Sequence, residues 1–96
     1  MSLDIGCVWD EDKYRQVRAN HDVRFYEVVS ALDDQHGYEI PDPAGHVGRW
    51  MWVGKTVHDR VLVVIYSEED LPLYRIITAF EAEGSWRHAY EQRPGV

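Results

Sequence analysis

The sequence predicts an α+β fold, in which two N-terminal helices and one C-terminal helix pack on a mainly antiparallel sheet. Apolar residues recur at helical spacing between residues 14 and 32, and again after residue 82. Between residues 49 and 80 they instead form strand-length segments joined by short links. Because these strands do not alternate with helices, antiparallel pairing is favoured over a parallel, doubly wound sheet.

The length of the chain favours a single domain. Ninety-six residues lie at the low end of what one hydrophobic core supports. Hydrophobic residues make up 45% of the chain and aromatic residues 12%, which is enough material for such a core. We therefore expect residues 1–96 to fold as one domain, with residues 93–96 as a flexible tail.

The first third of the chain predicts a short strand and two helices. Residues 3–9 alternate in polarity like a strand, and Asp10 then offers a helix N-cap. Residues 20–22 predict the end of this helix, because Asn and Asp tolerate the left-handed backbone conformation. The next helix has one apolar stripe, formed by Phe25, Val28, Val29 and Leu32. Glu27 lies outside that stripe, and the helix is expected to end near residues 33–34.

The rest of the chain predicts a loop, three strands and a last helix. Residues 41–48 contain two prolines and two glycines, which is typical of a loop. The expected strands are residues 49–53, 60–66 and 73–80. Residues 60–66 are apolar on both faces, which indicates a central strand covered on each side. The last helix is expected at about residues 82–92.

The net charge of −7 is unevenly distributed along the chain. Residues 1–46 hold ten acidic and four basic side chains, and residues 47–96 hold seven and six. Such a charge opposes long-range attraction to nucleic acid and favours a basic protein partner, although acidity is also an ordinary route to solubility. The overall charge still allows a local basic patch on the sheet, formed by Arg49, Lys55, Arg60 and Arg75.

The composition also indicates which cellular compartment and which cofactors to expect. The longest apolar run, residues 61–66, is far shorter than the roughly 18 residues of a membrane span, so we expect no membrane partner. The N-terminus lacks the pattern of a signal peptide, and a single cysteine, Cys7, suits a reducing interior. The sequence thus predicts a cytoplasmic protein. The five histidines show no ligand spacing, so neither a metal nor another cofactor is expected.

RNA cleavage without a metal is the chemistry for which the required residue types are present. It needs a base for the 2′-hydroxyl, an acid for the leaving oxygen, and cations on the phosphate. These types are supplied by His21, Glu27, Arg49, Arg60 and Arg75. An internal ion pair is the commoner role for a strand arginine such as Arg75, and strand aromatics are more often core than stacking platforms for bases.

A series of short motifs runs through about residues 8–91. They are Trp9-Asp10 with Lys13, residues 21–27, Asp33-Asp34, Pro41-Asp42-Pro43, Arg49, Gly54-Lys55, residues 60–66, residues 74–79, and Tyr90-Glu91. In this order and spacing the chain resembles the BrnT family, the ribonuclease toxins of type II toxin–antitoxin modules, which have a RelE-like α+β fold.

The resemblance implies a metal-independent ribonuclease toxin. It implies catalytic roles for His21, Glu27 and Arg75. It also implies RNA-binding roles for Arg49 and Lys55. As a member of the basic patch, Arg60 is expected to bind RNA as well. A ribbon-helix-helix antitoxin would be the protein partner and RNA the substrate, and a homodimer is left open.

The chain departs from the family pattern at four positions. Asn20 and Asp22 stand where the family usually has lysine and glycine, and Phe80 and Glu81 where it usually has basic residues. An alternative is therefore a catalytically degenerate relative that acts as a protein-interaction module. A small-ligand binder with an aromatic pocket near Trp50 and Trp52 is the third hypothesis.

Overall fold

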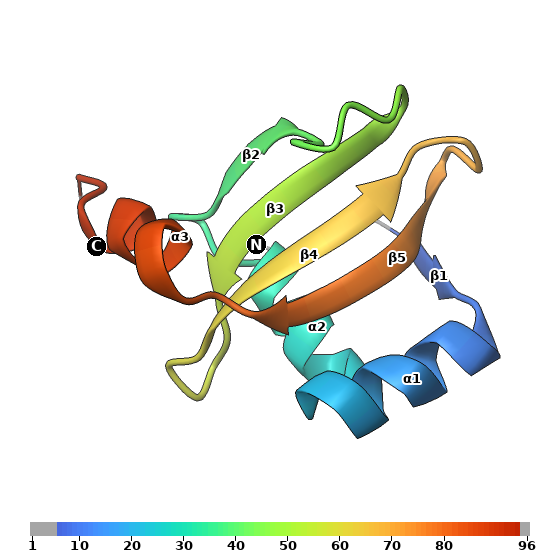
Figure 1. The fold of residues 1–96 in the computed structure, drawn as a ribbon, viewed down its shortest axis with the longest axis horizontal. Helices are drawn as coiled ribbons and strands as arrows, with labels where there is room; N and C mark the ends of the chain where they lie inside the picture. Colours follow the sequence, from blue (N-terminus) through green and yellow to red (C-terminus); the bar gives the residue numbers. More distant parts are fainter. Residues whose placement is uncertain (1–5, 95–96) are drawn as a thin grey trace.

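The computed structural model describes residues 6–94, which form three helices and five strands (Figure 1). In chain order these are β1 (Gly6–Trp9), α1 (Glu11–His21), α2 (Phe25–Leu32), β2 (Tyr38–Pro41), β3 (Arg49–Lys55), β4 (Val61–Ser67), β5 (Leu73–Glu81) and α3 (Gly84–Glu91). Residues 3–5 of the expected first strand and residues 95–96 of the expected tail lie outside the described residues.

The strands form one sheet in the order β1-β5-β4-β3-β2. The pairs β2–β3, β3–β4 and β4–β5 are antiparallel, and only the edge strand β1 runs parallel to its neighbour β5. The predicted α+β class with a mainly antiparallel sheet is therefore confirmed. The apolar segment at residues 60–66 becomes β4, the middle strand, and every β4 residue except the half-buried Ile65 is buried.

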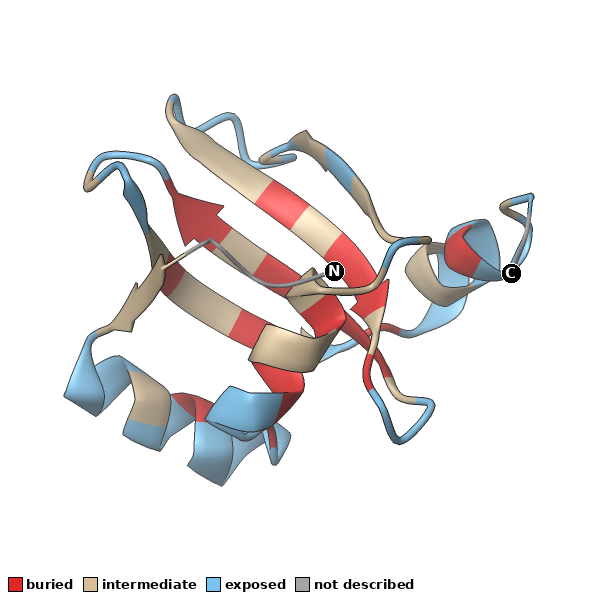
Figure 2. Cartoon of the chain, turned by 180° about the vertical axis from the view of Figure 1, so that it is seen from behind, coloured by how far each residue is buried: buried red, intermediate tan, exposed pale blue. Residues whose placement is uncertain are grey.

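Helices cover the two faces of the sheet unequally. The helices α1 and α2 pack on one face, and α3 covers one end of the other (Figures 1 and 2). The larger core cluster joins Val17, Val28 and Ala31 of the helices to Leu62 and Val64 of β4. A smaller cluster lies under α3, formed by Met51, Val53, Val61, Val63, Ala82 and Tyr90. The sheet thus has an α1/α2 face and an α3 face.

The predicted ends of α1 are confirmed by its backbone geometry. The Asp10 carboxylate accepts hydrogen bonds from the N–H groups of Asp12 and Lys13, which satisfies donors that the first turn leaves unpaired. Asp22 closes the helix in the left-handed conformation at φ 51°, and its N–H donates to the carbonyl of Arg18.

The strand β2 is an element that the sequence analysis did not predict. It occupies residues 38–41, and its last residue, Pro41, falls inside the stretch interpreted as a loop. A proline is tolerated there because β2 is an edge strand, and an edge strand needs only some of its N–H groups for the ladder. The last helix begins at Gly84 rather than near residue 82, because the N–H of Ala82 still bonds to Val61.

The packing of α2 on β3 requires a glycine on the strand. A Cβ at Gly54 would lie 2.2 Å from the carbonyl oxygen of Ala31 and 2.5 Å from Nε1 of Trp52. That indole N–H donates to the same carbonyl at 2.7 Å, so the end of α2 is fixed on the strand. No helix among the described residues is long and apolar enough to cross a membrane.

Candidate functional site

The six residues singled out in the sequence do not gather at one place. Arg49 and Lys55 occupy opposite ends of β3, about 20 Å apart along the strand. Arg75 instead shares a row with Arg49, because both pair with Ser67 of β4 from either side. The two arginines therefore lie on the α3 face with their backbones about 10 Å apart, across two strand spacings.

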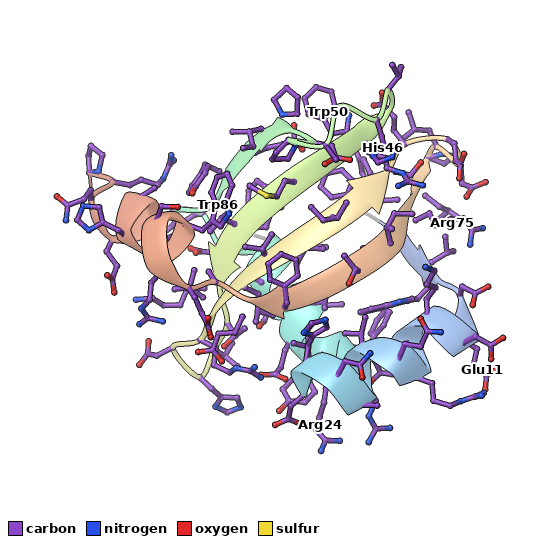
Figure 3. All side chains as sticks on the ribbon, viewed as in Figure 1. Glu11, Arg24, His46, Trp50, Arg75 and Trp86 are labelled. Carbon is purple, nitrogen blue, oxygen red and sulfur yellow. The ribbon has the colours of Figure 1, made fainter. Side chains whose placement is uncertain are left out.

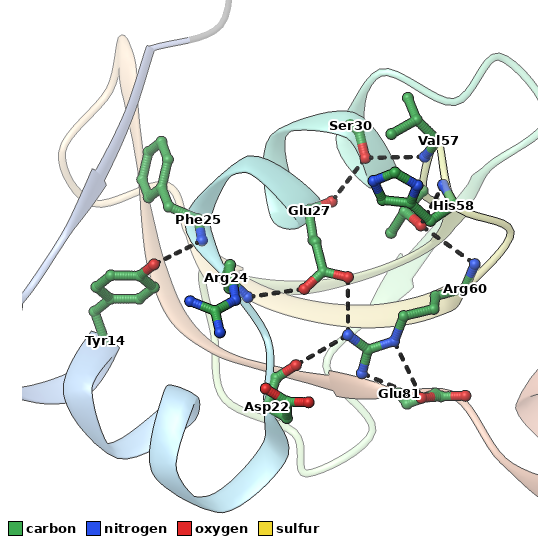
Figure 4. A network of polar contacts seen from close by, with 11 residues as sticks. Tyr14, Asp22, Arg24, Phe25, Glu27, Ser30, Val57, His58, Arg60 and Glu81 are labelled. Atoms are coloured by element: carbon green, nitrogen blue, oxygen red, sulfur yellow. Dashed lines mark hydrogen bonds and ion pairs between the residues drawn. The ribbon is translucent and has the colours of Figure 1, made fainter.

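Glu27 and Arg60 form a buried ion pair rather than an open site (Figure 4). The sequence places Glu27 outside the apolar stripe of its helix, but the residue is only 5% exposed. One carboxylate oxygen accepts from Arg60 Nη1 at 2.8 Å, and the other accepts from the N–H of Arg24 at 3.0 Å. The burial of this charge is explained by the cation that Arg60 brings to it.

Arg60 connects three parts of the chain. Its Nη1 also donates to the carbonyl of Asp22 at 2.9 Å, and its Nη2 lies 3.1 Å from Glu81 at the end of β5. Burial alone would lower the pKa of Arg60, but its bonds with Glu27 and Glu81 raise that pKa above its ordinary value. The guanidinium is thus fully engaged, and it fixes the backbone that immediately follows His21.

Arg75 is paired with Asp70 of the β4–β5 hairpin. Both side chains are more than one third exposed, and the bond to Asp70 raises the pKa of Arg75. Figure 3 shows Arg75 at one end of the sheet and Trp86, a residue of α3, at the opposite end. A half-exposed pair of this kind exchanges partners at low cost, so Arg75 remains available to an anion.

Lys55 and Arg49 have weaker contacts. The Lys55 ammonium lies 3.9 Å from the exposed carboxylate of Asp59 and 5.8 Å from the ring centre of Tyr90. Arg49 lies near Asp42, whose pKa is lowered by hydrogen bonds from the Ala44 N–H and the His46 ring and, more weakly, by the charges of His46 and Arg49.

A groove runs between α1 and β5, and two of the sequence candidates, Arg75 and His21, line it. Three hollows of about 320, 260 and 510 Å³ follow one another along it. The first and second share Lys13, Gln16 and Ile77, and the second and third share Asn20 and His21. We define these hollows together as the α1–β5 groove. Arg75 lines its first hollow, and His21 lines the second and third.

The polar stripe of α1 supplies the side of the groove that the sequence analysis did not assign. Lys13, Gln16 and Asn20 follow one another at i, i+3 and i+7, which places them on one face of the helix. The spacing is visible in the sequence, so a local argument can assign these three side chains to one surface of the helix.

The charges of the groove differ between its two ends. Lys13 and Arg75 line the first hollow together with Asp10 and Asp12, whereas Asp22, Glu81 and Glu83 line the third. Between these ends, the His21 ring lies 5.9 Å from the ring of Phe80. The groove therefore offers an imidazole beside an aromatic surface, with cations about two helical turns away.

Metal ligands are not grouped in the part of the chain that the structure covers. Within residues 6–94, no three or more His, Cys, Asp or Glu residues are arranged to hold a metal ion. His21 is the only described histidine that lines the groove.

Comparison with known proteins identifies a family for most of the chain. The model of the family described as "Ribonuclease toxin, BrnT, of type II toxin-antitoxin system" matches residues 9–85. The 1.1 Å crystal structure of the Brucella abortus ribonuclease toxin BrnT is similar in fold, with a TM-score of 0.59 and 21% sequence identity. That match covers 83% of this chain and 99% of the Brucella chain. No curated protein matches the sequence.

Proposed function

The chain belongs to the BrnT family, the ribonuclease toxins of type II toxin–antitoxin systems, and on that premise we propose that it cleaves RNA in the α1–β5 groove. The observation that carries this location is the continuity of the groove from Arg75 to His21. It brings a cation for phosphate and an imidazole for protons into one channel, next to an aromatic ring on which a base can stack.

The proposed reaction needs no metal. The 2′-hydroxyl attacks the neighbouring phosphorus, a P–O bond forms, and the bond from phosphorus to the 5′-oxygen breaks. The 2′-hydroxyl gives up its proton and the leaving 5′-oxygen gains one, so the products are a 2′,3′-cyclic phosphate and a 5′-hydroxyl. His21 serves as the proton-transferring group, because an imidazole exchanges protons efficiently near neutral pH.

The arginines and lysines hold the phosphates in this proposal. With the scissile phosphate at His21, Arg75 exchanges Asp70 for a phosphate further along the same strand of RNA, and Lys13 holds a phosphate next to that one. Arg49, in the same row as Arg75, extends the track across the α3 face. Lys55 lies at the far end of β3, so its RNA contact would be outside the groove.

Glu27 and Arg60 act as positioning residues in the proposed site. Glu27 orients the Arg60 guanidinium, which in turn binds the carbonyl of Asp22, the residue after His21. The ion pair thereby fixes the end of α1 from which the imidazole enters the groove. This role replaces the direct contact with RNA that the sequence analysis expects of the two residues.

An antitoxin is the partner that the family implies. We propose a ribbon-helix-helix protein for that role and the cytoplasm as the compartment, since the RNA substrate and the neutralising partner would both be present there. A homodimer of the toxin is not required by the groove, because every proposed site residue comes from one chain.

The decisive test is cleavage of a synthetic single-stranded RNA in excess EDTA. We expect the wild-type protein to yield 2′,3′-cyclic phosphate ends, and His21→Ala to lose about 100-fold or more in rate. Arg75→Ala should lose about tenfold or more, because a cation on the phosphate is removed. Arg87→Ala, which alters an exposed ion pair on α3, is the matched control and should cleave normally.

Expression in cells gives the second readout. Growth arrest with RNA loss for the wild type and for Arg87→Ala, but not for His21→Ala, would support the toxin. Equal cleavage by the wild type and His21→Ala would overturn the groove as the site. A folded wild-type protein without any cleavage would leave the interaction module as the better interpretation.

A further inference from the structure

An aromatic pocket lies outside the α1–β5 groove and shares no lining residue with it. It has a volume of about 270 Å³, and Trp52, Tyr66 and Tyr74 form its walls. Leu32 closes it from the end of α2, and the carboxylate residues Asp33 and Glu39 line it as well. At this size the pocket fits a single side chain better than a drug-sized molecule.

The walls of the aromatic pocket are held in place before any ligand enters. The rings of Tyr66 and Tyr74 pack edge to face with their centres 5.0 Å apart. The Trp52 indole is fixed by its hydrogen bond to Ala31. Tyr66 is 5% exposed and belongs to the core, so these walls would not need to reorganise on binding.

The electrostatics of the pocket favour a cation. Within residues 6–94, Oδ1 of Asp33 is buried without a hydrogen-bond partner. Burial and the nearby charge of Glu68 raise the pKa of Glu39, as expected for a carboxylate in a crowded negative field. Asp34 is already engaged by Tyr90 and by two backbone N–H groups. A phosphate would be repelled here, whereas aromatic faces and carboxylates both attract a guanidinium.

We propose that the aromatic pocket receives an arginine side chain of the antitoxin. A planar guanidinium can stack on the Trp52 and tyrosine rings while it donates to Asp33 and Glu39. The overall charge of −7 is complementary to a basic partner segment and opposed to RNA at this face. The inference rests on the proposed function only for the identity of the partner, since the pocket itself lies outside the groove.

The test is a titration of the full chain with a blocked pentapeptide that carries one central arginine. Binding is followed by NMR at the Trp52 indole N–H, and the control peptide carries citrulline, a neutral analogue of the same shape. We expect the arginine peptide to shift the Trp52 signal and to bind about tenfold or more tightly than the citrulline peptide, because the charge-assisted hydrogen bonds are lost in the control.

Two variants test whether the carboxylates of the pocket bind the charge of the arginine. Asp33→Asn and Glu39→Gln remove a charge without changing the size of the side chain, and each should weaken the arginine peptide several-fold. Glu11→Gln, an exposed acid on α1, should bind it like the wild type. All three should retain RNA cleavage. A wild-type protein that cleaves RNA but does not bind the arginine peptide overturns this inference and leaves the proposed function standing.

Three other outcomes would also overturn the proposal. Equal affinity for the arginine and citrulline peptides would show that charge is not recognised. Peptide-induced shifts confined to α3 or to the groove would place the site elsewhere. Tighter binding of free agmatine, which carries the same guanidinium, than of the peptide would identify a small free cation as the ligand instead of a partner segment.

Discussion

Glu27 and Arg60 illustrate how a single buried charge is kept in a small core. Glu27→Gln removes the negative charge but keeps the volume, and leaves the Arg60 guanidinium partly uncompensated. Because Arg60 keeps Glu81 as a partner and its side chain is 24% exposed, we expect a loss of about 2 kcal/mol in the free energy of unfolding, below the cost of breaking a fully buried pair. Urea unfolding measures it.

The control for this loss is Glu11→Gln, which breaks a solvent-exposed pair with Arg15 and should cost under about 0.5 kcal/mol. The same pair of variants separates the two possible roles of Glu27. If Glu27→Gln abolished cleavage while its unfolding curve matched the wild type, the carboxylate would act on RNA directly, and the positioning role proposed here would be wrong.

Tyr90 and Asp34 provide a pH-dependent contact between α3 and the end of α2. Burial by itself would raise the pKa of Asp34, but hydrogen bonds from Tyr90, from the N–H of Lys55 and from the N–H of His36 outweigh it and lower that pKa. A carboxyl group with a lowered folded-state pKa stabilises the fold above the ordinary Asp pKa, and this contribution is lost as the pH falls through the lowered value.

Tyr90→Phe tests this contact. We expect it to destabilise the protein by about 1–2 kcal/mol at pH 7, because the carboxylate loses a hydrogen bond. The difference from the wild type should shrink as acid protonates Asp34. Thermal unfolding monitored by circular dichroism from pH 7 to pH 3 gives both curves. A difference that is constant over this range would show that lost packing, not the bond to Asp34, causes the destabilisation.

Residue types alone could identify His21 and Arg75 as candidates but not their surroundings. Both residues line the α1–β5 groove. They could be identified because a histidine at a helix end and a cation on a strand are local features of the sequence. The partners of Glu27 could not be predicted, since Arg60 reaches it from 33 positions away in the chain. The position of Lys13 in the groove could be predicted from the nearby sequence, because Lys13, Gln16 and Asn20 have the i, i+3, i+7 spacing of one helix face.

At the scale of elements, Asp22 is the residue whose replacement can stabilise the end of α1. It adopts φ 51°, which glycine reaches without steric cost. Arg60 binds the backbone carbonyl of Asp22, so this contact survives the change of side chain. We expect Asp22→Gly to stabilise the protein by about 0.5–1 kcal/mol, and Asp22→Val to destabilise it by more than that.

Equilibrium unfolding of both variants in urea measures these changes. A destabilised Asp22→Gly variant would mean that the aspartate side chain contributes more to the helix end than its backbone strain costs. Because glycine also loses entropy on folding, the net gain is expected to stay at the lower end of the stated range.

Elements with strong local patterns were predictable, and elements that depend on their neighbours were not. The apolar stripe of α2 and the continuous apolar run of β4 are properties of the segments themselves, and both elements form as expected. The strand β2 alternates between half-buried and exposed residues, but it has only four residues and ends in Pro41. It forms because β3 offers an edge with which it can pair. Likewise, the parallel pairing of β1 with β5 depends on α1 and α2 carrying the chain from one edge of the sheet to β2 at the other edge.

At the scale of the whole molecule, the net charge opposes the proposed substrate. A polyanion is repelled by a protein of charge −7, so the groove must provide attraction locally, and its acidic end at Asp22, Glu81 and Glu83 weakens that attraction. Replacing Glu81 would disturb Arg60, and replacing Asp22 would change the end of α1. Glu83, whose side chain makes no capping hydrogen bond, is therefore the acid to replace.

Glu83→Lys should therefore strengthen RNA binding. It changes the net charge from −7 to −5, because one negative charge becomes one positive charge. If the new lysine meets a phosphate in the groove, log affinity should fall about 0.7 more steeply with log salt concentration, the contribution of one contact to a single strand. Fluorescence anisotropy with a labelled RNA, measured on a His21→Ala background to prevent cleavage, gives the affinity at each salt concentration.

Glu91→Lys makes the same change in net charge on α3, away from the groove. Long-range attraction alone would raise the affinity of both variants equally and leave their salt slopes nearly parallel, because no counterion is released at a new contact. RNA in the groove would steepen the slope for Glu83→Lys only. Parallel slopes for the two variants would therefore show that RNA lies on another surface, and would move the search to the row of Arg49 and Arg75 on the α3 face.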